Sequence, residues 1–377
     1  MRSWERWRHF ADAPRTVWDL AVRGRYSSVF DYMPMTVRGM RPRQRLNTLR
    51  AGLNLAHRRL SPWAWPLHMQ FELASCCNLR CPVCPVGTGE LARPARFLDV
   101  DLFERAMAEV GPYLLLACLW AWGEPLLHPE LARVLAIAGR YPLTTLISTN
   151  GQNLDRPDVQ SALREHPPTY LIVALDGLTD ETNAVYRKGA RLAPALAGVR
   201  ELAEWKRRSG ARLPILHMRL MAMRHNEHEV PRLREFAAAH DFDMASLRSL
   251  SIIDSAEQSA HGEMLPQSAT LRPYAYDGGQ RARRSDFVCQ HAFTFPTLLA
   301  DGTLVSCEQD YNASRPYGAM DRDTSFAEIW FGERARAVRK TIRDTPGEIG
   351  FCRNCPYADR PTSSCSLESH LLRPFAV

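Results

Sequence analysis

The stretch Ser75-Cys76-Cys77-Asn78-Leu79-Arg80-Cys81-Pro82-Val83-Cys84-Pro85 decides how the whole chain is interpreted. It places Cys77, Cys81 and Cys84 in a C-x3-C-x2-C spacing, with Cys76 directly before them. Both zinc and iron–sulfur clusters bind thiolate ligands. A zinc site usually pairs two cysteine knuckles, whereas the next cysteine, Cys118, lies far away in an apolar run. We therefore expect the three spaced cysteines to hold three irons of a cubane cluster and to leave the fourth iron open.

Length and composition indicate an ordinary globular protein. The 377 residues suffice for a large α/β domain and a smaller one, and 45% are hydrophobic and 24% charged. No apolar run is long enough for a membrane-spanning helix, and the N-terminal residues lack the apolar core of a secretion signal. Ten cysteines without an export signal favour metal binding or catalysis over disulfides. We therefore expect a cytoplasmic protein.

Positive charge is concentrated in residues 1–66, which carry 13 Arg, no Lys and four acids, a net charge of +9. The same arm holds five of the nine Trp. Helix-length pieces such as residues 44–60 mix arginine with leucine, which suits either an anionic membrane surface or a partner protein. The alternative is a solvated arm whose Trp and Leu residues dock on the rest of the protein.

Apolar runs alternate with helix-like segments after the arm. Asp101 is the expected N-cap of the first helix, and His128 precedes the second. Later helices are expected at residues 193–208 and 230–240. The expected strands are residues 67–73, 114–120, 143–148, 170–175, 215–221 and 243–250. This alternation predicts a parallel sheet, and six βα units predict an α/β fold built on a partial (βα)6 TIM-like barrel.

Four polar motifs follow four successive strands, and loops after parallel strands share one rim of a barrel. They are the cysteine loop, Trp122-Gly123-Glu124-Pro125, Ser148-Thr149-Asn150-Gly151 and Asp176-Gly177. We expect this rim to form the active site. A purely structural role remains an alternative for Glu124 as a helix-capping acid and for Asp176 as a turn former.

The C-terminal part does not continue the alternation of strands and helices. We divide the chain into the basic helical arm (1–66), the barrel (67–275) and a small hairpin and helix domain (276–377). Within the last domain we expect a hairpin at 295–307 and an amphipathic helix at 325–343. Its cysteines can supply four thiolates, from Cys289, Cys307, Cys352 and Cys355, to a cluster or to a structural zinc. Cys365 is left over; it replaces one ligand, donates a hydrogen atom to a substrate radical, or does neither.

Over residues 67–377 these motifs resemble those of the radical SAM superfamily. The run CNLRCPVC resembles the family's cluster loop, and residues 122–125 resemble its GGEP motif with Trp122 in place of the first glycine. The STNG and LDG loops and the run Tyr186-Arg187-Lys188-Gly189 resemble its SPASM/twitch branch. The four C-terminal cysteines resemble the twitch form, which carries one auxiliary 4Fe–4S cluster.

The resemblance implies the cofactors and their contacts. Cys77, Cys81 and Cys84 would hold a 4Fe–4S cluster beside S-adenosylmethionine (SAM), residues 122–125 would contact the SAM amino group, and Arg187 its carboxylate. Ser148, Asn150 and Asp176 are further cofactor-binding positions, whereas Ala174 stands where a ribose-contacting serine is usual. An external electron donor such as flavodoxin or ferredoxin would supply the electron that splits SAM. The 5′-deoxyadenosyl radical would then take hydrogen from a substrate C–H.

The substrate is expected to be a sugar, an aminocyclitol or another natural-product intermediate, which is oxidised or epimerised. A lipid or lipid-linked substrate is an alternative because of the basic arm. A peptide is another, although the arm is too short and too strand-poor to resemble a leader-binding winged helix. An iron–sulfur electron carrier is disfavoured because the C-x2-C-x2-C-x3-C run is absent. Nucleic acid is an unlikely partner because no RRM, KH or zinc-knuckle pattern occurs.

Overall fold

The computed structural model describes residues 13–57, 59–250, 262–272, 274, 276–277, 280–281, 287–353, 355–358 and 365–374. The beginning of the arm, with Trp4 and Trp7, lies outside this range, as does most of the expected connector after the sixth strand. Among the described helices, none combines the length and the apolar character needed to cross a membrane.

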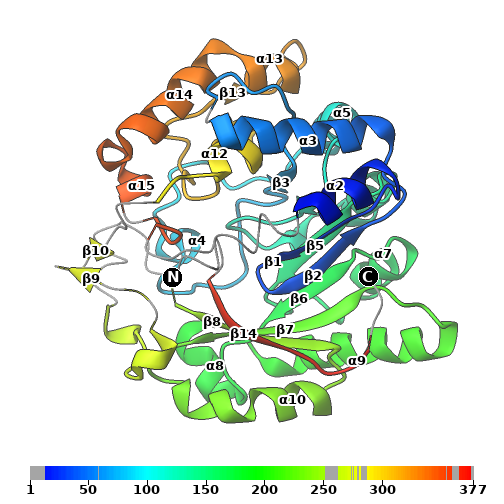
Figure 1. Cartoon of the computed structure of the whole chain (residues 1–377). Helices are drawn as coiled ribbons and strands as arrows, with labels where there is room; N and C mark the ends of the chain where they lie inside the picture. Colours follow the sequence, from blue (N-terminus) through cyan, green and yellow to red (C-terminus); the bar gives the residue numbers. More distant parts are fainter. Residues whose placement is uncertain are drawn as a thin grey trace.

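Six parallel strands form the centre of the molecule (Figure 1). They pair in chain order within one ten-stranded sheet of order β13-β12-β11-β3-β4-β5-β6-β7-β8-β14. The six are β3 (His68–Phe71), β4 (Leu116–Cys118), β5 (Thr144–Thr149), β6 (Tyr170–Ala174), β7 (Ile215–Ala222) and β8 (Met244–Ser249). All are largely buried, as expected for parallel strands covered on both faces. The partial barrel is confirmed.

Helices pack on the outer face of these strands and bury a large apolar core. They are α5 (Val100–Val110), α6 (Leu131–Ala138), α7 (Pro157–Glu165), α8 (Asp180–Tyr186), α9 (Leu192–Ser209) and α10 (Leu233–Ala239), the last preceded by η2 (Glu227–Arg232). The cap of α5 is Asp99, whose side chain accepts a hydrogen bond from the amide of Leu102. The prediction that Asp101 caps this helix was wrong, because Asp101 lies one residue inside the first turn.

The C-terminal part extends the sheet at both edges. The hairpin of β11 (Thr297–Leu298) and β12 (Thr303–Val305) pairs with β3, and β13 (Gly318–Ala319) pairs with β12. At the other edge, β14 (Ser366–Leu371) runs antiparallel to β8. The division into domains at residues 66 and 275 stays a prediction, but strands on both sides of the second boundary belong to one sheet.

Short elements complete this part, namely η3 (Gly262–Met264), η4 (Ala269–Leu271), β9 (Tyr276–Asp277), β10 (Gln280–Arg281), α12 (His291–Thr294), α13 (Phe326–Phe331), α14 (Glu333–Asp344), η5 (Pro346–Glu348) and α15 (Gly350–Arg353). The expected single helix at 325–343 is therefore two helices. Ser325 and Glu328 form a capping box at the start of α13, and Gly332, in an extended conformation, separates α13 from α14.

The described part of the arm is not purely helical. After α2 (Ala13–Ala21), strands β1 (Tyr26–Phe30) and β2 (Met33–Val37) form a hairpin, and α3 (Pro42–His57) follows. Met33 and Met35 pack inside the barrel against side chains of β4, β5, β6, β7 and β8. The Tyr170 hydroxyl donates to the carbonyl of Pro34 at 2.5 Å. The strand-poor arm was thus a wrong prediction, because this hairpin fills the interior of the barrel.

Candidate active site

The cysteine loop follows β3 and folds tightly upon itself. The amide of Cys84 donates to the carbonyl of Cys81 at 3.2 Å, and α4 (Pro85–Thr88) begins directly after Cys84. A Cβ atom on Gly87 would lie 2.2 Å from the Cys81 carbonyl oxygen, so a larger residue at this position would displace the loop. This fold brings the thiols of Cys77, Cys81 and Cys84 to one cavity.

Burial makes these thiols poor thiolates without a cation. It raises the pKa of Cys77 to about 11 and the pKa of Cys81 to about 12, and it raises the pKa of Cys84 as well. Each thiolate also raises the pKa of its neighbours. Because bound metal ions deprotonate thiols outright, one buried and two partly buried thiols side by side suit a cationic iron cluster. The residues present therefore fit the cluster that the sequence predicts.

A cavity of about 340 Å³ opens above the cysteine loop. That volume lies in the range of roughly 300–1,000 Å³ typical of small-molecule sites. The expected site residues that line it are Cys77, Cys81, Cys84, Trp122, Gly123, Glu124, Ser148, Asn150, Asp176, Arg187 and Cys365. Pro125 is buried in η1 (Pro125–Leu127) and is absent from the lining. The structure thus brings all but one of the predicted catalytic and SAM-contacting residues together, and the four auxiliary cysteines lie at a second cavity.

Glu124 holds two of the rim loops together. Its carboxylate accepts hydrogen bonds from the Thr149 hydroxyl at 2.7 Å, the Asn150 amide at 2.8 Å and the Leu126 amide at 3.0 Å. Burial raises the pKa of Glu124, although these donors lower it in part. The capping role that was the structural alternative is therefore present, together with a link to the STNG loop. Gly123 is required beside it, since a Cβ there would lie 1.9 Å from the Ala74 carbonyl oxygen.

Arg187 and Asp176 form a buried ion pair at the cavity wall. The Arg187 Nε lies 2.7 Å from the Asp176 Oδ2, and the other Asp176 oxygen accepts from the Met221 amide at 2.8 Å. Burial would lower the pKa of Arg187, but the charges of Asp176 and Cys81 raise it above its usual value. The guanidinium is thus a fixed cation close to the cysteines, which suits the carboxylate contact that the resemblance implies.

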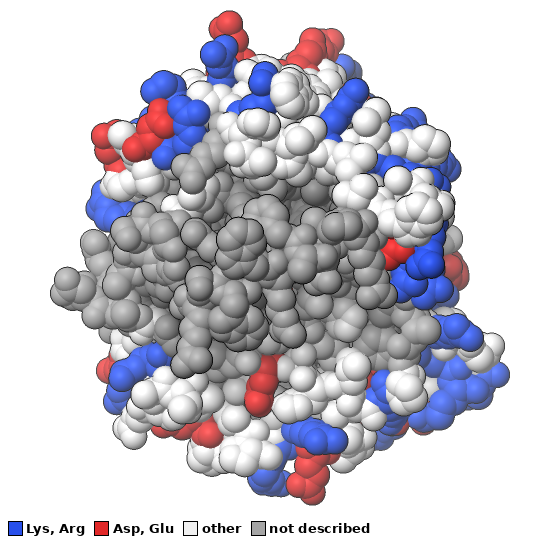
Figure 2. All heavy atoms as spheres, viewed as in Figure 1, with Lys and Arg blue, Asp and Glu red and all other residues white. Residues whose placement is uncertain are grey.

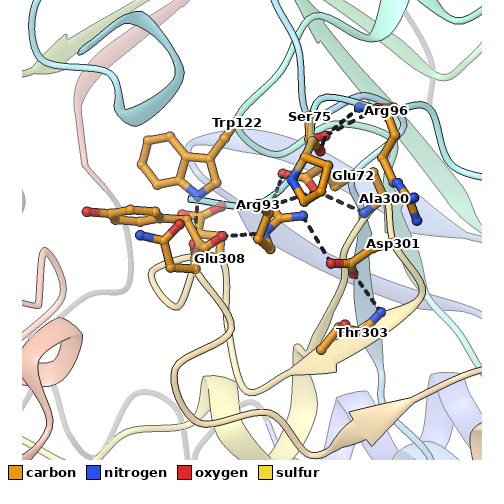
Figure 3. Close-up of polar contacts among 12 residues, drawn as sticks. Glu72, Ser75, Arg93, Arg96, Trp122, Ala300, Asp301, Thr303 and Glu308 are labelled. Carbon is orange, nitrogen blue, oxygen red and sulfur yellow. Dashed lines mark hydrogen bonds and ion pairs between the residues drawn. The ribbon is translucent and has the colours of Figure 1, made fainter. Parts of the chain in front are cut away.

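Trp122 connects the barrel with the C-terminal hairpin, which explains why tryptophan can replace the motif's glycine. Its Nε1 donates to the Glu308 carbonyl at 2.7 Å, and Figure 3 shows the two residues facing each other. A second link lies alongside. The Arg93 Nη2 donates to both oxygens of Glu72 at 2.8 Å, and its Nε donates to the Tyr311 carbonyl at 2.6 Å. The loop of residues 308–311 is thereby fixed over the cavity.

Cys289, Cys307, Cys352 and Cys355 line a second, smaller cavity. Burial raises the pKa of Cys307 well above its usual value, and the other three cysteines raise it further, so the four thiols lie within electrostatic reach of one another. Four thiols at one cavity suit an iron–sulfur cluster or a structural zinc, the two alternatives that the sequence left open.

Cys365 belongs to the larger cavity. It is 4% exposed, lies directly before β14, and lines the space above Cys77, Cys81 and Cys84 rather than the second cavity. This position favours a role toward a substrate over a role as an auxiliary ligand. Cys118 lies in β4 and is 1% exposed, as expected for a small buried side chain.

The sequence did not predict a charged group at the far wall of this cavity. Asp31, in the turn of the β1–β2 hairpin, lies 3.0 Å from Arg219 of β7 and 3.8 Å from Arg248 of β8. Arginines inside otherwise apolar strands are a usable signal, because a buried charge needs a partner or a function. Asp31 carried no such signal, since only the tertiary fold brings it to the cavity.

Glu308 was also missed, although it directly follows Cys307. Its carboxylate accepts from the Tyr357 hydroxyl at 3.0 Å and from the side-chain Nε2 of Gln309 at 3.3 Å. Asp31 and Asp176, by contrast, pair with arginines. Glu308 thus brings a carboxylate with neutral donors to the space between the two cysteine groups.

Comparisons with known proteins agree with this arrangement. The model of the radical SAM superfamily matches residues 71–237, and that of the SPASM iron–sulfur cluster-binding domain matches residues 289–356. The mycofactocin maturase MftC of Mycobacterium ulcerans is 26% identical over 326 residues, which cover 80% of this chain and 83% of that protein. The PqqA peptide cyclase of Gluconobacter oxydans is 29% identical over 96 residues, which cover 26% of each chain.

The fold has a close counterpart among solved structures. Streptococcus suis SuiB bound to S-adenosylmethionine superposes with a TM-score of 0.59 at 14% sequence identity, over 82% of this chain and 75% of SuiB. The two family models together match more than half of the chain. A radical SAM domain implies a 4Fe–4S cluster and SAM, and a SPASM domain implies auxiliary iron–sulfur clusters, in agreement with the predicted cofactors. The chain therefore belongs to the radical SAM superfamily and carries a SPASM domain.

Proposed function

We propose that this protein is a radical SAM enzyme that removes a hydrogen atom from a carbon of a peptide. The sequence favoured a sugar or an aminocyclitol as the substrate, and a peptide substrate was an alternative. What carries the change is the nature of the relatives, since one is named a peptide cyclase and SuiB has also been solved with its precursor peptide SuiA. The arm contains a hairpin, but this hairpin packs inside the barrel and does not itself support a peptide substrate, so the relatives alone carry the change.

The proposal assigns each rim residue a role in binding or positioning. Cys77, Cys81 and Cys84 hold the cluster, and Arg187 binds the SAM carboxylate while Asp176 fixes its orientation. Bound there, the cluster and SAM supply one electron and a radical that takes hydrogen from a substrate carbon. The barrel wall and the hairpin turn at Asp31 enclose this space and exclude water. An external electron donor such as flavodoxin or ferredoxin reduces the cluster in this scheme.

For an oxidative outcome, the substrate must lose a proton and a second electron after hydrogen removal. Glu308 is the proton acceptor that we propose, because its carboxylate lines the cavity and has neutral donors. It directly follows Cys307, so an auxiliary cluster held by Cys307 would lie next to it and would supply an acceptor for the electron. Proton and electron would thus leave the substrate on the same side of the cavity.

A redox-neutral epimerisation is the second candidate, favoured by one observation. The Cys365 thiol is buried in the wall of the same cavity as the cluster cysteines, where it can return a hydrogen atom to a substrate radical. One electron from the external donor and one proton from solvent would then convert the Cys365 thiyl radical back to the thiol. The two outcomes differ in a measurable way. Replacing Cys365 by alanine blocks epimerisation but spares oxidation, whereas replacing Glu308 by glutamine slows oxidation and spares epimerisation.

The test is deuterium transfer from labelled substrates. Anaerobically reconstituted enzyme is mixed with dithionite, SAM and either a library of deuterated peptides or a set of deuterated sugars and aminocyclitols. We expect mass spectrometry to find deuterium in 5′-deoxyadenosine only with the peptides and not with the Cys81→Ala variant. Label arriving from the sugars alone would overturn the peptide assignment.

A further inference from the structure

Helix α3 is oriented opposite to an ordinary surface helix. Its buried face carries Gln44, Asn47, Ala51 and Asn54. Its leucines at positions 46, 49 and 53 are instead 47%, 40% and 51% exposed. A helix on a globular protein normally turns its apolar side to the core. Within the described part of the chain, the exposed leucines of α3 therefore lack the partner that this pattern predicts.

Hydrogen bonds explain why the polar face is turned inward. The Gln44 side chain donates to the Leu114 carbonyl at 2.6 Å, and the oxygens of Asn47 and Asn54 accept from the amides of Trp65 and Trp63 at 2.9 Å. These partners offset part of the desolvation cost of the buried amides, although the Gln44 Oε1 accepts no hydrogen bond within the described residues. The orientation is thus fixed by specific contacts with the barrel and the segment before it, and the leucines stay outside.

The three leucines form one stripe with arginines beside it. At 100° per residue, Leu46, Leu49 and Leu53 lie within about 60° of one another around the helix axis. Arg43 and Arg50 are exposed and border the stripe. The arrangement of a leucine stripe, flanking arginines and modest overall hydrophobicity is that of helices that lie in the interface of a membrane.

Helix α2 continues this surface. Val17 and Trp18 of α2 are 47% and 58% exposed, and Val22, directly after the helix, is 56% exposed. The end of α2 lies against α3, where the Arg45 Nη1 donates to the Ala21 carbonyl at 3.0 Å. We call the exposed apolar side chains of α2 and α3 together the docking face. In Figure 2, blue basic side chains border the uncharged surface over these two helices.

The charge distribution selects the occupant. Residues 1–66 carry a net charge of +9, whereas the remaining chain comes to about −2. Trp63 is 48% exposed and has Arg59 stacked 3.8 Å above its ring. Exposed tryptophan together with arginine is typical of the membrane–water interface, and anionic lipids attract such basic segments. We propose that the docking face binds the surface of an anionic phospholipid membrane, independently of the substrate of the enzyme.

Vesicle flotation of the full-length holoenzyme tests this. The probes are vesicles of phosphatidylcholine alone and of phosphatidylcholine with phosphatidylglycerol. We expect binding to the anionic vesicles only. Arg43→Gln/Arg50→Gln should bind about thirty-fold more weakly, since each basic residue near an anionic surface contributes about 1 kcal/mol. The control, Arg133→Gln/Arg156→Gln, removes two exposed arginines elsewhere and should bind like the wild type.

The leucine variant separates lipid from other occupants. Leu46→Gln/Leu49→Gln/Leu53→Gln should lose binding to anionic vesicles while keeping its melting temperature and iron content. Equal binding of the wild type to both vesicle types, or unchanged binding of this variant, would overturn the proposal. The proposal would also be overturned if the protein bound a synthetic acidic, leucine-containing peptide but no vesicles. That result would assign the docking face to a protein partner. If the wild type self-associated, bound no vesicles, and lost self-association in the leucine variant, the docking face would be assigned to a second copy of the chain.

Discussion

Replacing Arg93 by methionine should destabilise the protein far more than replacing Arg133, although Arg133 has more acidic partners. Arg93 is 7% exposed and pairs with Glu72, which is fully buried (Figure 3). Arg133 contacts Asp101, Glu104 and Glu130 but is 44% exposed. Removing one partner of a buried pair costs about 3–5 kcal/mol, whereas exposed pairs contribute at most about 1 kcal/mol.

These energies convert into measurable melting temperatures. An unfolding entropy of roughly 2.1 cal/mol/K per residue over 377 residues gives a decrease of about 4–6 °C for Arg93→Met. The control Arg133→Met should lose about 1 °C or less. Differential scanning calorimetry of the reconstituted protein measures both. The double variant Glu72→Gln/Arg93→Met should regain part of the loss, because an uncharged pair leaves no buried charge.

The stability of Arg93→Met should depend on pH in a direction that follows from the pKa of Glu72. Burial raises the pKa of Glu72 in the folded protein, and Arg93 lowers it in part. Without Arg93 the folded-state pKa rises further, so the variant binds a proton more tightly when folded than when unfolded. Its stability should therefore be greatest below the pKa of Glu72 in the unfolded chain and should decrease as the pH rises through the raised pKa of Glu72 in the folded protein. Equal losses for Arg93→Met and Arg133→Met, or no recovery in the double variant, would refute the reasoning.

Three further predictions concern the cofactors and the reaction. Cys81→Ala should abolish the release of 5′-deoxyadenosine from SAM in the presence of dithionite, whereas the control Cys76→Ala should still release it. Liquid chromatography measures the 5′-deoxyadenosine, and its release by Cys81→Ala would contradict the cluster assignment. Iron analysis should give about eight irons per chain for the wild type and for Cys365→Ala, and about four for Cys307→Ala. A lower iron content in Cys365→Ala would instead identify Cys365 as a cluster ligand. Glu308→Gln should slow product formation at least about a hundredfold without slowing SAM cleavage, and equal slowing of both would remove the proton-acceptor role.

The cysteine loop and the barrel rim could be predicted because their signals are local. Three cysteines within eight residues require a common partner, and the end of a buried parallel strand places each following loop on the same rim. Gly87 and Gly123 occupy positions where a Cβ would overlap backbone oxygen atoms. These constraints act over a few residues, so they are visible in the sequence.

The contacts of the two ends of the chain could not be predicted in the same way. Met33 and Met35 face the barrel interior only because residues 26–37 turn back on themselves, and nothing nearby indicates which cavity they enter. Asp31 and Cys365 reach the active-site wall through pairings across hundreds of residues. The orientation of α3 was equally hidden, because hydrogen bonds of Gln44 and Asn47 to distant backbone override the leucine pattern.

The pairing of β14 with β8 has a consequence for biosynthesis. On the ribosome, the six parallel strands emerge well before residues 366–371 are translated, so β8 presents an open edge in the meantime. Such an edge is a template for pairing between nascent chains. Chains released after β8 but before β14 should therefore aggregate. Delivery of iron and sulfide to the cysteine loop would best follow completion of this edge.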